Sequence, residues 1–488
     1  MGAALKSLLQ FNARSDQLMD KNKMPLPDML CIHGFNKSVW ARSWSAKNFV
    51  ASVPFVALIS FLVFVPLMLV MGCDPKPVIN GSRSVAVGQE VLLTVEQGPG
   101  FIRDDLQLED SEGNIYKHSS EELNYIFESD KKISFTIPQG IATGPARLYL
   151  GAEGRTTGYN IDLKIVRLVA LLSESGYIHV IDTSTGKTVQ STQIGTGKVS
   201  ARLSIDGHHI IATARDEAVV HFLRFDGTGL RPYAPAIERV GTGMGDAVTI
   251  PSGALLAVKE GLAVINQLTN NATVLDGFLE VPPMRGLAGG MGKGRVIGLA
   301  EPSTDATGVG NQLYVVDLTD DGPEVRDQPF DIGGMPGSAG HMVLSKNADR
   351  LYVADRINDS ITLVTITDTN LQVSAPVLLP SEQISENEEI QHSDPIRIRL
   401  TPDESELIVL CGASGSMVRY EVTENGGLVQ KGTVMLDGLP FDVGFVSKTA
   451  YIIVDNDVRK LDLESNQPEP IKVEWENTAG ALTIMMQP

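Results

Sequence analysis

The chain has 488 residues, with 40 Lys and Arg against 59 Asp and Glu, and its formal net charge is −19 at pH 7. Residues 1–48 hold seven Lys or Arg and three Asp or Glu, so residues 49–488 carry a net charge of −23. Such an acidic body repels phosphate backbones, which argues against nucleic acid as a partner. The length is enough to build one or two large hydrophobic cores.

An uncharged apolar run lies at residues 49–71. As a helix these 23 residues would span about 34 Å, enough to cross the hydrocarbon core of a bilayer. The basic flank before the run is expected to stay in the cytoplasm, which places the rest of the chain outside it. A signal sequence normally begins nearer the start of a chain. Either translation starts later, at Met24 or Met29, or residues 1–48 form a cytoplasmic tail, and the sequence leaves both open.

The run ends in Val70-Met71-Gly72-Cys73, which resembles the lipobox of bacterial lipoproteins. In that family signal peptidase II cleaves before the cysteine, and the cysteine thiol carries diacylglycerol. The resemblance implies lipidation at Cys73 and a lipid-anchored protein of the cell envelope, on either the inner or the outer membrane. The alternative is an uncleaved signal anchor that ends at a chance cysteine.

Two further cysteines occur in the chain. Cys31 precedes the apolar run, and Cys411 lies in the apolar stretch "ELIVLCGASG". The exported part is therefore expected to hold no internal disulfide, and Cys411 is expected to be a buried, unreactive strand residue.

Residues 74–165 predict a small β-sandwich. Short alternating strands such as "EVLLTVE" and "ARLYLG" are separated by clusters of Gly, Asp and Ser. The stretch "ISFTIPQGIATGPARLYLG" resembles the closing strands of IPT/TIG-type immunoglobulin-like domains, and "INGSRSVAVGQEVLLTV" resembles their opening. Another small β-sandwich is the alternative.

Residues 166–488 repeat one pattern: a Gly- or Pro-rich lead, an apolar strand, a polar turn and a second apolar strand. Two of six examples are "IGTGKVSARLSIDGHHIIATA" and "SDPIRIRLTPDESELIVL". Their starts lie roughly 40–56 residues apart, a period typical of four-stranded propeller blades. The C-terminal "ALTIMMQP" matches a first strand without a second, and residues 166–194 match second to fourth strands without a first. The pattern predicts an all-β chain with seven blades, one of which is shared between the two ends.

Two blades resemble the YVTN-type propeller repeat. They read "DRLYVADRINDSITLVTITDTN" and "GYIHVIDTSTGKTVQSTQIGTG". The resemblance implies a YncE-like exported propeller, in a fold shared with lactonase-type seven-bladed propellers. This repeat specifies a fold and leaves the activity open.

Signatures of catalysis and of cofactors are missing from the sequence. No Gly-x-Ser-x-Gly nucleophile motif and no Cys-x-x-Cys-His haem motif occurs. The Gly-rich stretches "GTGMGD" and "GGMGKG" lack the spacing of dinucleotide-binding and P-loops. We therefore expect no catalytic residue, no cofactor and no metal site.

The first strands of the blades and their leads line the mouth of a propeller channel, where propellers usually bind ligands. Each polar residue there is either a ligand contact, an exposed rim charge or part of a cross-blade ion pair. Together they would suit a polar or anionic small molecule or a peptide. The candidates are Arg202, Asp246, Arg285, His341, Arg397, Arg399 and Asp442.

Two hypotheses for function follow. The first is a monomeric, membrane-tethered extracytoplasmic lipoprotein whose propeller is a binding or scaffold module for a protein, a peptide or a small anionic ligand. The second is a lactonase-like, metal-dependent hydrolase with its site in the channel mouth. The lactonase site needs several carboxylates and Asn around one ion, whereas the predicted inner strands hold more Arg than Glu.

The lipobox generates a direct test. Cys73→Ser should abolish lipid labelling and leave an unprocessed precursor, because the thiol is the expected attachment point. Labelling with a radioactive fatty acid, together with the mass of the mature chain, measures both effects. A wild-type chain that keeps residues 1–72 and takes up no lipid would show that the lipoprotein interpretation is wrong.

Overall fold

The computed structural model divides the chain into two units, Met1–Cys73 and Asp74–Pro488, and all described residues belong to the second. The apolar run at 49–71 and Cys73 lie outside the described residues. No helix in the described part of the chain is long and apolar enough to cross a membrane. The structure describes residues 78–485 with gaps at 80–82, 95–105, 118–122, 124, 130–131, 139, 151–158, 198, 204–208, 226–228, 252, 267–272, 291–293, 303–309, 327, 381–391, 447, 456, 466–467 and 472–480.

The first described strands form a β-sandwich. They are β1 (Val78–Ile79), β2 (Ser84–Ala86), β3 (Glu90–Thr94), β4 (Leu106–Glu109), β5 (Ile115–Lys117), β6 (Tyr125–Ser129), β7 (Lys132–Thr136), β8 (Gly144–Leu150) and β9 (Tyr159–Val166). Their two sheets have the orders β1-β3-β7-β6 and β2-β9-β8-β4-β5. Alternate residues such as Leu106 and Leu108 turn inward and share one buried cluster with Leu148 and Ile165. The likeness to IPT/TIG domains stays a prediction.

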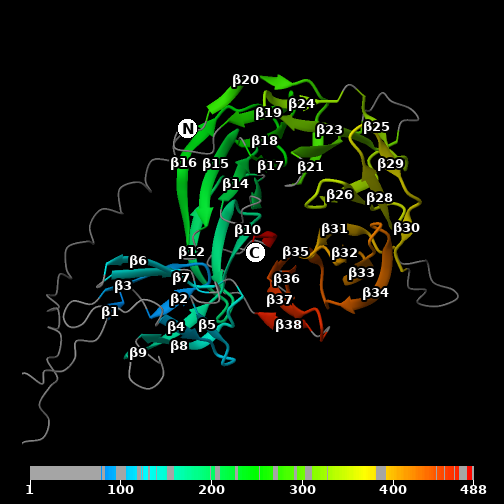
Figure 1. Ribbon diagram of the computed structural model, residues 1–488. Helices are drawn as coiled ribbons and strands as arrows, with labels where there is room; N and C mark the ends of the chain where they lie inside the picture. Colours follow the sequence, from blue (N-terminus) through cyan, green and yellow to red (C-terminus); the bar gives the residue numbers. More distant parts are fainter. Residues whose placement is uncertain are drawn as a thin grey trace, which may run out of the picture. The chain divides into compact units, whose positions relative to one another are not determined.

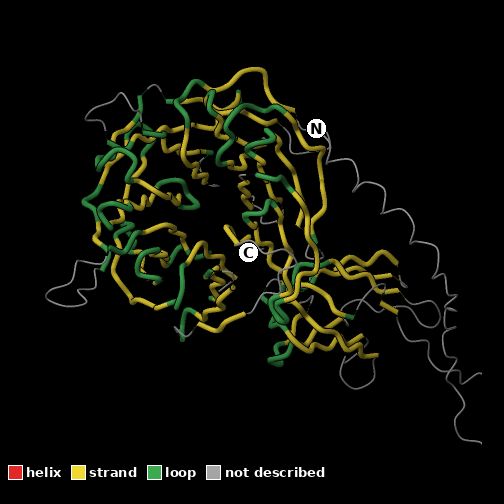
Figure 2. The backbone as a smooth tube through the Cα atoms, turned by 180° about the vertical axis from the view of Figure 1, so that it is seen from behind, coloured by secondary structure: helices red, strands yellow, loops and turns green. Residues whose placement is uncertain are grey.

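The remaining strands form seven antiparallel sheets, arranged as the blades of a propeller (Figure 1). Seen from behind, the described part of the chain consists of strands and loops (Figure 2). The predicted all-β, seven-bladed propeller is confirmed. The closing blade consists of β39 (Ala481–Met485), β10 (Leu168–Ser173), β11 (Tyr177–Asp182) and β12 (Lys187–Gln193).

Six further blades follow in chain order, and the first strand of each lies nearest the axis of the ring (Figure 1). Blade 1 consists of β13 (Val199–Leu203), β14 (His209–Ala214), β15 (Val219–Phe225) and β16 (Leu230–Glu238). Blade 2 consists of β17 (Ala247–Ile250), β18 (Gly253–Val258), β19 (Gly261–Asn266) and β20 (Thr273–Leu279). Blade 3 consists of β21 (Met284–Gly290), β22 (Arg295–Ala300), β23 (Gln312–Thr319), β24 (Gly322–Val325) and β25 (Phe330–Asp331). Blade 4 consists of β26 (Ala339–Leu344), β27 (Arg350–Asp355), β28 (Ser360–Ile366), β29 (Leu371–Val373) and β30 (Val377–Leu378). Blade 5 consists of β31 (Pro395–Leu400), β32 (Glu406–Cys411), β33 (Ser416–Val422) and β34 (Leu428–Met435). Blade 6 consists of β35 (Pro440–Val446), β36 (Thr449–Val454), β37 (Asp457–Asp462) and β38 (Pro468–Ile471).

Hydrophobic clusters join each blade to the next. The second strands read as continuous apolar runs because neighbouring sheets cover both of their faces, and all residues of β18, β22 and β32 are buried. Between blades 4 and 5, for example, Ile361 packs in one cluster with Leu407. Cys411 belongs to that cluster, and burial raises its pKa to about 12, as expected for an unreactive thiol.

The two ends of the propeller sequence meet in the closing blade. β39 pairs with β10 in antiparallel register, with Leu171 opposite Ile484 and Leu172 opposite Thr483. Val169 and Leu171 then pack against Tyr451 of blade 6, which completes the circle of inter-blade clusters. The predicted shared blade is therefore present, and it removes the two sheet edges that an open ring would expose.

Carboxylates hold the lead of a blade to the turn between its second and third strands. Glu217 accepts hydrogen bonds from the backbone N and the hydroxyl of Thr196, at 2.7 and 2.6 Å. Glu260 does the same for Thr242 in the next blade, at 3.0 and 2.5 Å. These bonds fix where each first strand begins, and so where its side chains meet the axis.

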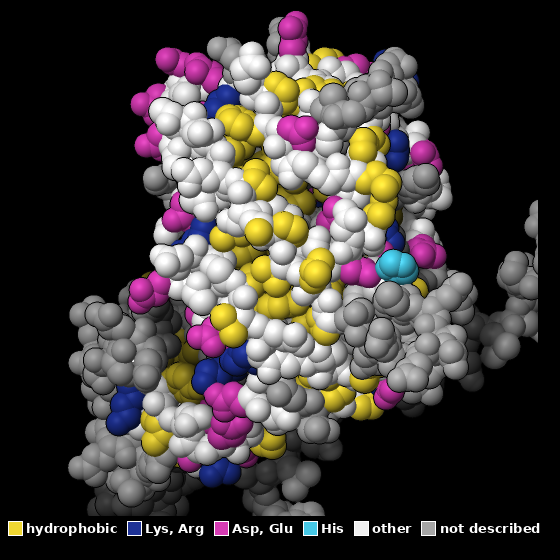
Figure 3. Space-filling view, turned by 90° about the vertical axis from the view of Figure 1, so that its right-hand side faces the viewer, with side chains coloured by type: hydrophobic (Ala, Val, Ile, Leu, Met, Phe, Trp, Pro, Cys, Tyr) yellow, Lys and Arg dark blue, Asp and Glu magenta, His cyan; other side chains and the backbone are white. Residues whose placement is uncertain are grey.

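The outermost strand is interrupted in blades 3 and 4. Pro329 separates β24 from β25, and Pro376 separates β29 from β30, because proline cannot donate to a ladder. Figure 3 shows the side of the molecule that carries β29 and β30, where hydrophobic side chains lie across the middle and most charged ones nearer the edges. Leu378 and Val373 are exposed there.

Ring closure can be tested by truncation. Deleting residues 481–488 removes β39 and exposes the edge of β10, so the variant should aggregate and melt at least about 5 °C lower. Deleting only 486–488, which follow β39, is the control and should leave the melting temperature unchanged. An unaltered melting temperature in the longer deletion would contradict the β39–β10 pairing.

Candidate functional site

Polar side chains of blades 1, 2, 4, 5 and 6 meet at the axis of the ring. All of them lie on first strands or directly before one. Contacts between blades join them: Arg202 pairs with Asp246, Arg397 and Arg399 both reach Asp442, and His341 contacts the backbone of β31. We call this set the axial cluster; it consists of Arg202, Asp246, His341, Arg397, Arg399 and Asp442.

Arg202 and Asp246 form one cross-blade ion pair. Arg202, on β13, donates from Nε and Nη2 to the two carboxylate oxygens of Asp246, each at 2.7 Å. The same carboxylate accepts from the backbone N of Ala247 and of Leu287, both at 3.1 Å. Burial alone would raise the pKa of Asp246, but Arg202 and these donors hold it below its usual value. Asp246 is therefore ionised, and the hydrogen bonds that it accepts link blades 1, 2 and 3.

Arg399 and Asp442 form a second pair of the same kind. Arg399, on β31, donates from Nε and Nη2 to Asp442 on β35, at 3.1 and 2.8 Å. The Asp442 side chain is fully buried, and although burial opposes its ionisation, Arg399 and Arg397 lower its pKa. Arg397 is less well matched: its Nε lies 3.4 Å from the same carboxylate and 3.4 Å from the carbonyl oxygen of Phe441.

His341 lies on β26, beside blade 5. Its Nδ1 accepts a long hydrogen bond of 3.4 Å from the backbone N of Ile398, so the neutral ring carries its proton on Nε2. Burial, together with the charges of Arg397, Arg202 and Arg399, holds the pKa of His341 well below its usual value. Nε2 is buried and has no hydrogen-bond partner in the described part of the chain.

Arg285 does not join the axial cluster. It is the second residue of β21, is exposed, and donates from Nη1 to the carbonyl oxygen of Gly337 at 2.8 Å. The structure thus brings six of the seven candidate axial residues together and leaves Arg285 at the surface. The predicted lipidation site Cys73 lies outside the described residues.

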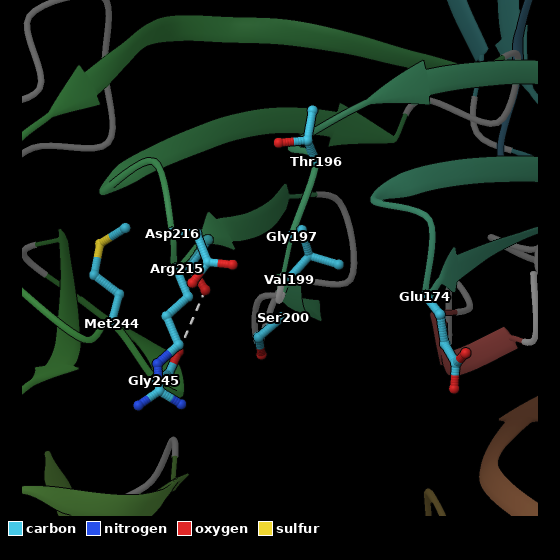
Figure 4. A pocket seen from close by; sticks show the side chains of 10 residues that line it. Glu174, Thr196, Gly197, Val199, Ser200, Arg215, Asp216, Met244 and Gly245 are labelled. Carbon is cyan, nitrogen blue, oxygen red and sulfur yellow. Dashed lines mark hydrogen bonds between the residues drawn. The ribbon is translucent and has the colours of Figure 1, made fainter.

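A pocket of about 610 Å³ is lined by segments of the closing blade and of blades 1 and 2, two of which also carry Arg202 and Asp246 of the axial cluster. Its lining includes Ser200, two residues before Arg202 on β13, and Gly245, directly before Asp246. We call it the mouth pocket, and Figure 4 shows Arg215 and Glu174 on opposite sides of it. Sequence reasoning missed the pocket, because its walls come from four connections that are far apart in the chain.

The pairing of the axial charges also had a signal in the sequence. Arg202 and Asp246 lie 44 residues apart, and Arg399 and Asp442 lie 43 apart, which is one blade period in each case. An arginine on one first strand is thus matched by an aspartate one blade later. Spacing by the repeat could have predicted both ion pairs.

The chemistry of the cluster follows from these contacts. Both carboxylates are already engaged by guanidinium groups, while solvent reaches all three arginines, whose side chains are 21–29% exposed. In the described residues, no three His, Cys, Asp or Glu side chains are placed to hold a metal ion together. The arrangement offers hydrogen-bond donors and positive charge to a ligand.

No protein-family model matches the chain, and no curated protein matches it. Among solved structures, a functionally unknown protein from Desulfotomaculum acetoxidans is 12% identical, with a TM-score of 0.51 over 65% of this chain and 98% of that chain. A hypothetical selenium-binding protein from Sulfolobus tokodaii is 11% identical, with a TM-score of 0.50 over 65% and 92%. The periplasmic gluconolactonase of Pseudomonas aeruginosa is 11% identical, with a TM-score of 0.49 over 66% and 99%. Such likenesses bear on the fold alone, and the third is too remote for any argument.

Asp442→Asn should lower the free energy of unfolding by about 3 kcal/mol, because it leaves Arg397 and Arg399 without their buried counter-charge. Urea unfolding at pH 7 measures this loss. Glu464→Gln, which removes the partner of exposed Lys448, is the control and should leave stability unchanged. A stable Asp442→Asn variant would show that the buried pair contributes nothing to the fold.

The same carboxylates predict acid sensitivity. The folded-state pKa values of Asp246 and Asp442 are lowered, so their contribution to stability is fully present above the unfolded value of about 3.9. It is lost as the pH falls below that value through the folded-state pKa. Stability measured from pH 6 to pH 2 should therefore fall less steeply in Asp442→Asn than in the wild type. Parallel curves would contradict the lowered pKa of Asp442.

Proposed function

We propose that this protein is a membrane-tethered, extracytoplasmic binding module whose ligand site is the axial cluster together with the mouth pocket. The observation that carries the proposal is that three arginines and one histidine lie on first strands of three blades around one axis (Figure 1). Their contacts with two aspartates and with the backbone of β31 hold them there. Two arginines would be enough to pair with the two aspartates. The guanidinium of Arg397 is a third, and Nε2 of His341 has no hydrogen-bond partner among the described residues.

The alternative is a lactonase-like hydrolase that uses a metal ion at the axis. Such an enzyme needs carboxylates whose oxygens are open to the ion. At this axis, Arg202 holds both oxygens of Asp246 and Arg399 holds both oxygens of Asp442. The positive charges would also repel a divalent cation, so the contacts favour binding over metal-assisted hydrolysis.

The membrane tether rests on the sequence alone. The apolar run at 49–71 and the lipobox at Cys73 support a lipid anchor in the inner or outer membrane. The strongly acidic body would keep the propeller soluble beside an anionic surface. We further propose that the chain works as a monomer.

Ligand screening by thermal shift tests the proposal on the full chain in neutral detergent. The panel holds four charge classes of small molecule: amines, neutral sugars, carboxylates and phosphates. A ligand at a hundred times its dissociation constant stabilises the folded state by about 2.7 kcal/mol, so at least one class should raise the melting temperature. The shift should disappear in Arg399→Leu and persist in Arg285→Ala, which is outside the cluster.

Metal dependence separates the two candidates. For a binding module, Ca²⁺, Zn²⁺ or a chelator should leave the melting temperature unchanged, and lactones should not be consumed. Lactone turnover that requires an added divalent ion and is lost in His341→Ala would establish the hydrolase instead. A panel in which no class shifts the melting temperature would overturn the binding site at the axis.

A further inference from the structure

The six residues of the axial cluster together carry one more positive charge than negative charge. Its three guanidinium groups face two carboxylates, Asp246 and Asp442, and His341 is neutral, which leaves a net charge of +1. This surplus lies inside a body, residues 49–488, whose net charge is −23. A single negative charge from a ligand would balance it.

The surplus charge is located on Arg397. Arg202 and Arg399 each hold a carboxylate with two nitrogens, at 3.1 Å or less. Arg397 reaches Asp442 and the carbonyl oxygen of Phe441 only through Nε, at 3.4 Å in both cases. Its two terminal nitrogens have no hydrogen-bond partner within the described part of the chain. The edge of the guanidinium that best fits two parallel oxygens is therefore available.

His341 supplies a second unmatched donor. Because Nδ1 accepts from the backbone N of Ile398, the proton is on Nε2, and that atom is buried without a partner among the described residues. A buried donor without an acceptor costs about 1–3 kcal/mol, so such groups usually mark a missing partner. Ile398 directly follows Arg397 on β31, so the contact between its backbone N and Nδ1 places His341 beside the segment that carries Arg397.

The missing partner must accept hydrogen bonds and carry negative charge. The carboxylates of the cluster are committed to arginines, so the site has donors to offer and no open acceptor. The planar fork of an arginine matches the two coplanar oxygens of a carboxylate, and one carboxylate carries the single charge that the cluster lacks. A phosphate dianion would reverse the net charge of the site.

The rest of the ligand has room in the mouth pocket. Ser200 and Arg202 are two residues apart on β13, so their side chains leave the strand on the same face. The pocket, of about 610 Å³, also presents the side chain of Met244, and its charged residues are Arg215, Glu174 and Asp216, so it does not favour a second negative charge on the ligand. These surroundings suit a neutral body with both polar and apolar atoms.

We infer that the axial cluster binds the carboxylate of a small monocarboxylic acid, with Arg397 and the Nε2–H of His341 as its two contacts. The neutral body of this acid occupies the mouth pocket. The inference rests on the proposed function, because it names the chemical class of ligand for the same site.

Isothermal titration calorimetry on the full chain in neutral detergent tests the inference. The probes are sodium acetate, glycolate and benzoate, matched by the neutral acetamide, glycolamide and benzamide. Phosphate, sulfate and ethylamine complete the panel, and sodium chloride keeps the ionic strength constant. At least one carboxylate should bind at least about tenfold more tightly than its own amide and than phosphate or sulfate.

Three variants locate the site. Arg397→Lys keeps the charge but loses the fork, so carboxylate affinity should fall at least about tenfold. His341→Phe removes the Nε2–H at similar ring size and should weaken binding as well, while Arg285→Ala is the control and should bind as the wild type does. Circular dichroism establishes that each variant keeps its fold. Unchanged carboxylate affinity in folded Arg397→Lys and His341→Phe would overturn the two assigned contacts.

The outcomes separate the inference from the proposed function. Preferred binding of phosphate or sulfate, or binding of an amide or ethylamine as tight as that of the carboxylates, overturns the carboxylate assignment while the axial site stands. If no probe binds and the wider thermal-shift panel is also negative, the binding function itself fails. Carboxylate binding that the Arg397 and His341 variants lose supports both.

Discussion

The hydrogen bonds between β39 and β10 are the constraint on which the rest of the propeller depends. Each blade is held by the hydrophobic clusters and the ion pairs that it shares with its neighbours, so the ring keeps its geometry as long as it is closed. The axial cluster draws on five blades, on both sides of the closing blade, and the charge of Asp442 reaches Arg202 across it. Loss of the β39–β10 pairing would separate these charges, so the geometry of the site depends on the stability of the closed ring.

The axial ion pairs stabilise the propeller, but the cluster contains one more arginine than these pairs need. Asp246 is saturated by four donors from three blades, which makes it a clamp between first strands. Asp442 is matched to Arg399 in the same way, and Arg397 is then one cation too many. The Arg397 side chain is mostly, but not fully, removed from water; this partial burial without a well-matched partner is costly and lowers its pKa. A structure that keeps such a residue at its axis bears a cost that a bound anion would remove.

The fold could be predicted because its signals are local. Apolar second strands, Gly-rich leads and a C-terminal strand without a partner predict blades and a shared closing blade from short windows of sequence. The site was predicted only in part. First-strand positions located the axial residues, but Arg285 occupies such a position and still turns outward to Gly337. The mouth pocket depends on how connections from the closing blade and from blades 1 and 2 come together, which no single window contains.

The shared blade also has a consequence for the order of synthesis. Ala170 pairs with Met485, 315 residues later, so the first strand of the propeller to be made waits for the last. Until then β10 presents an unpaired edge, and such non-local pairing is slow to form. A nascent or truncated chain therefore exposes a template for pairing with other chains. The chain is therefore most prone to aggregation between the synthesis of β10 and the synthesis of β39.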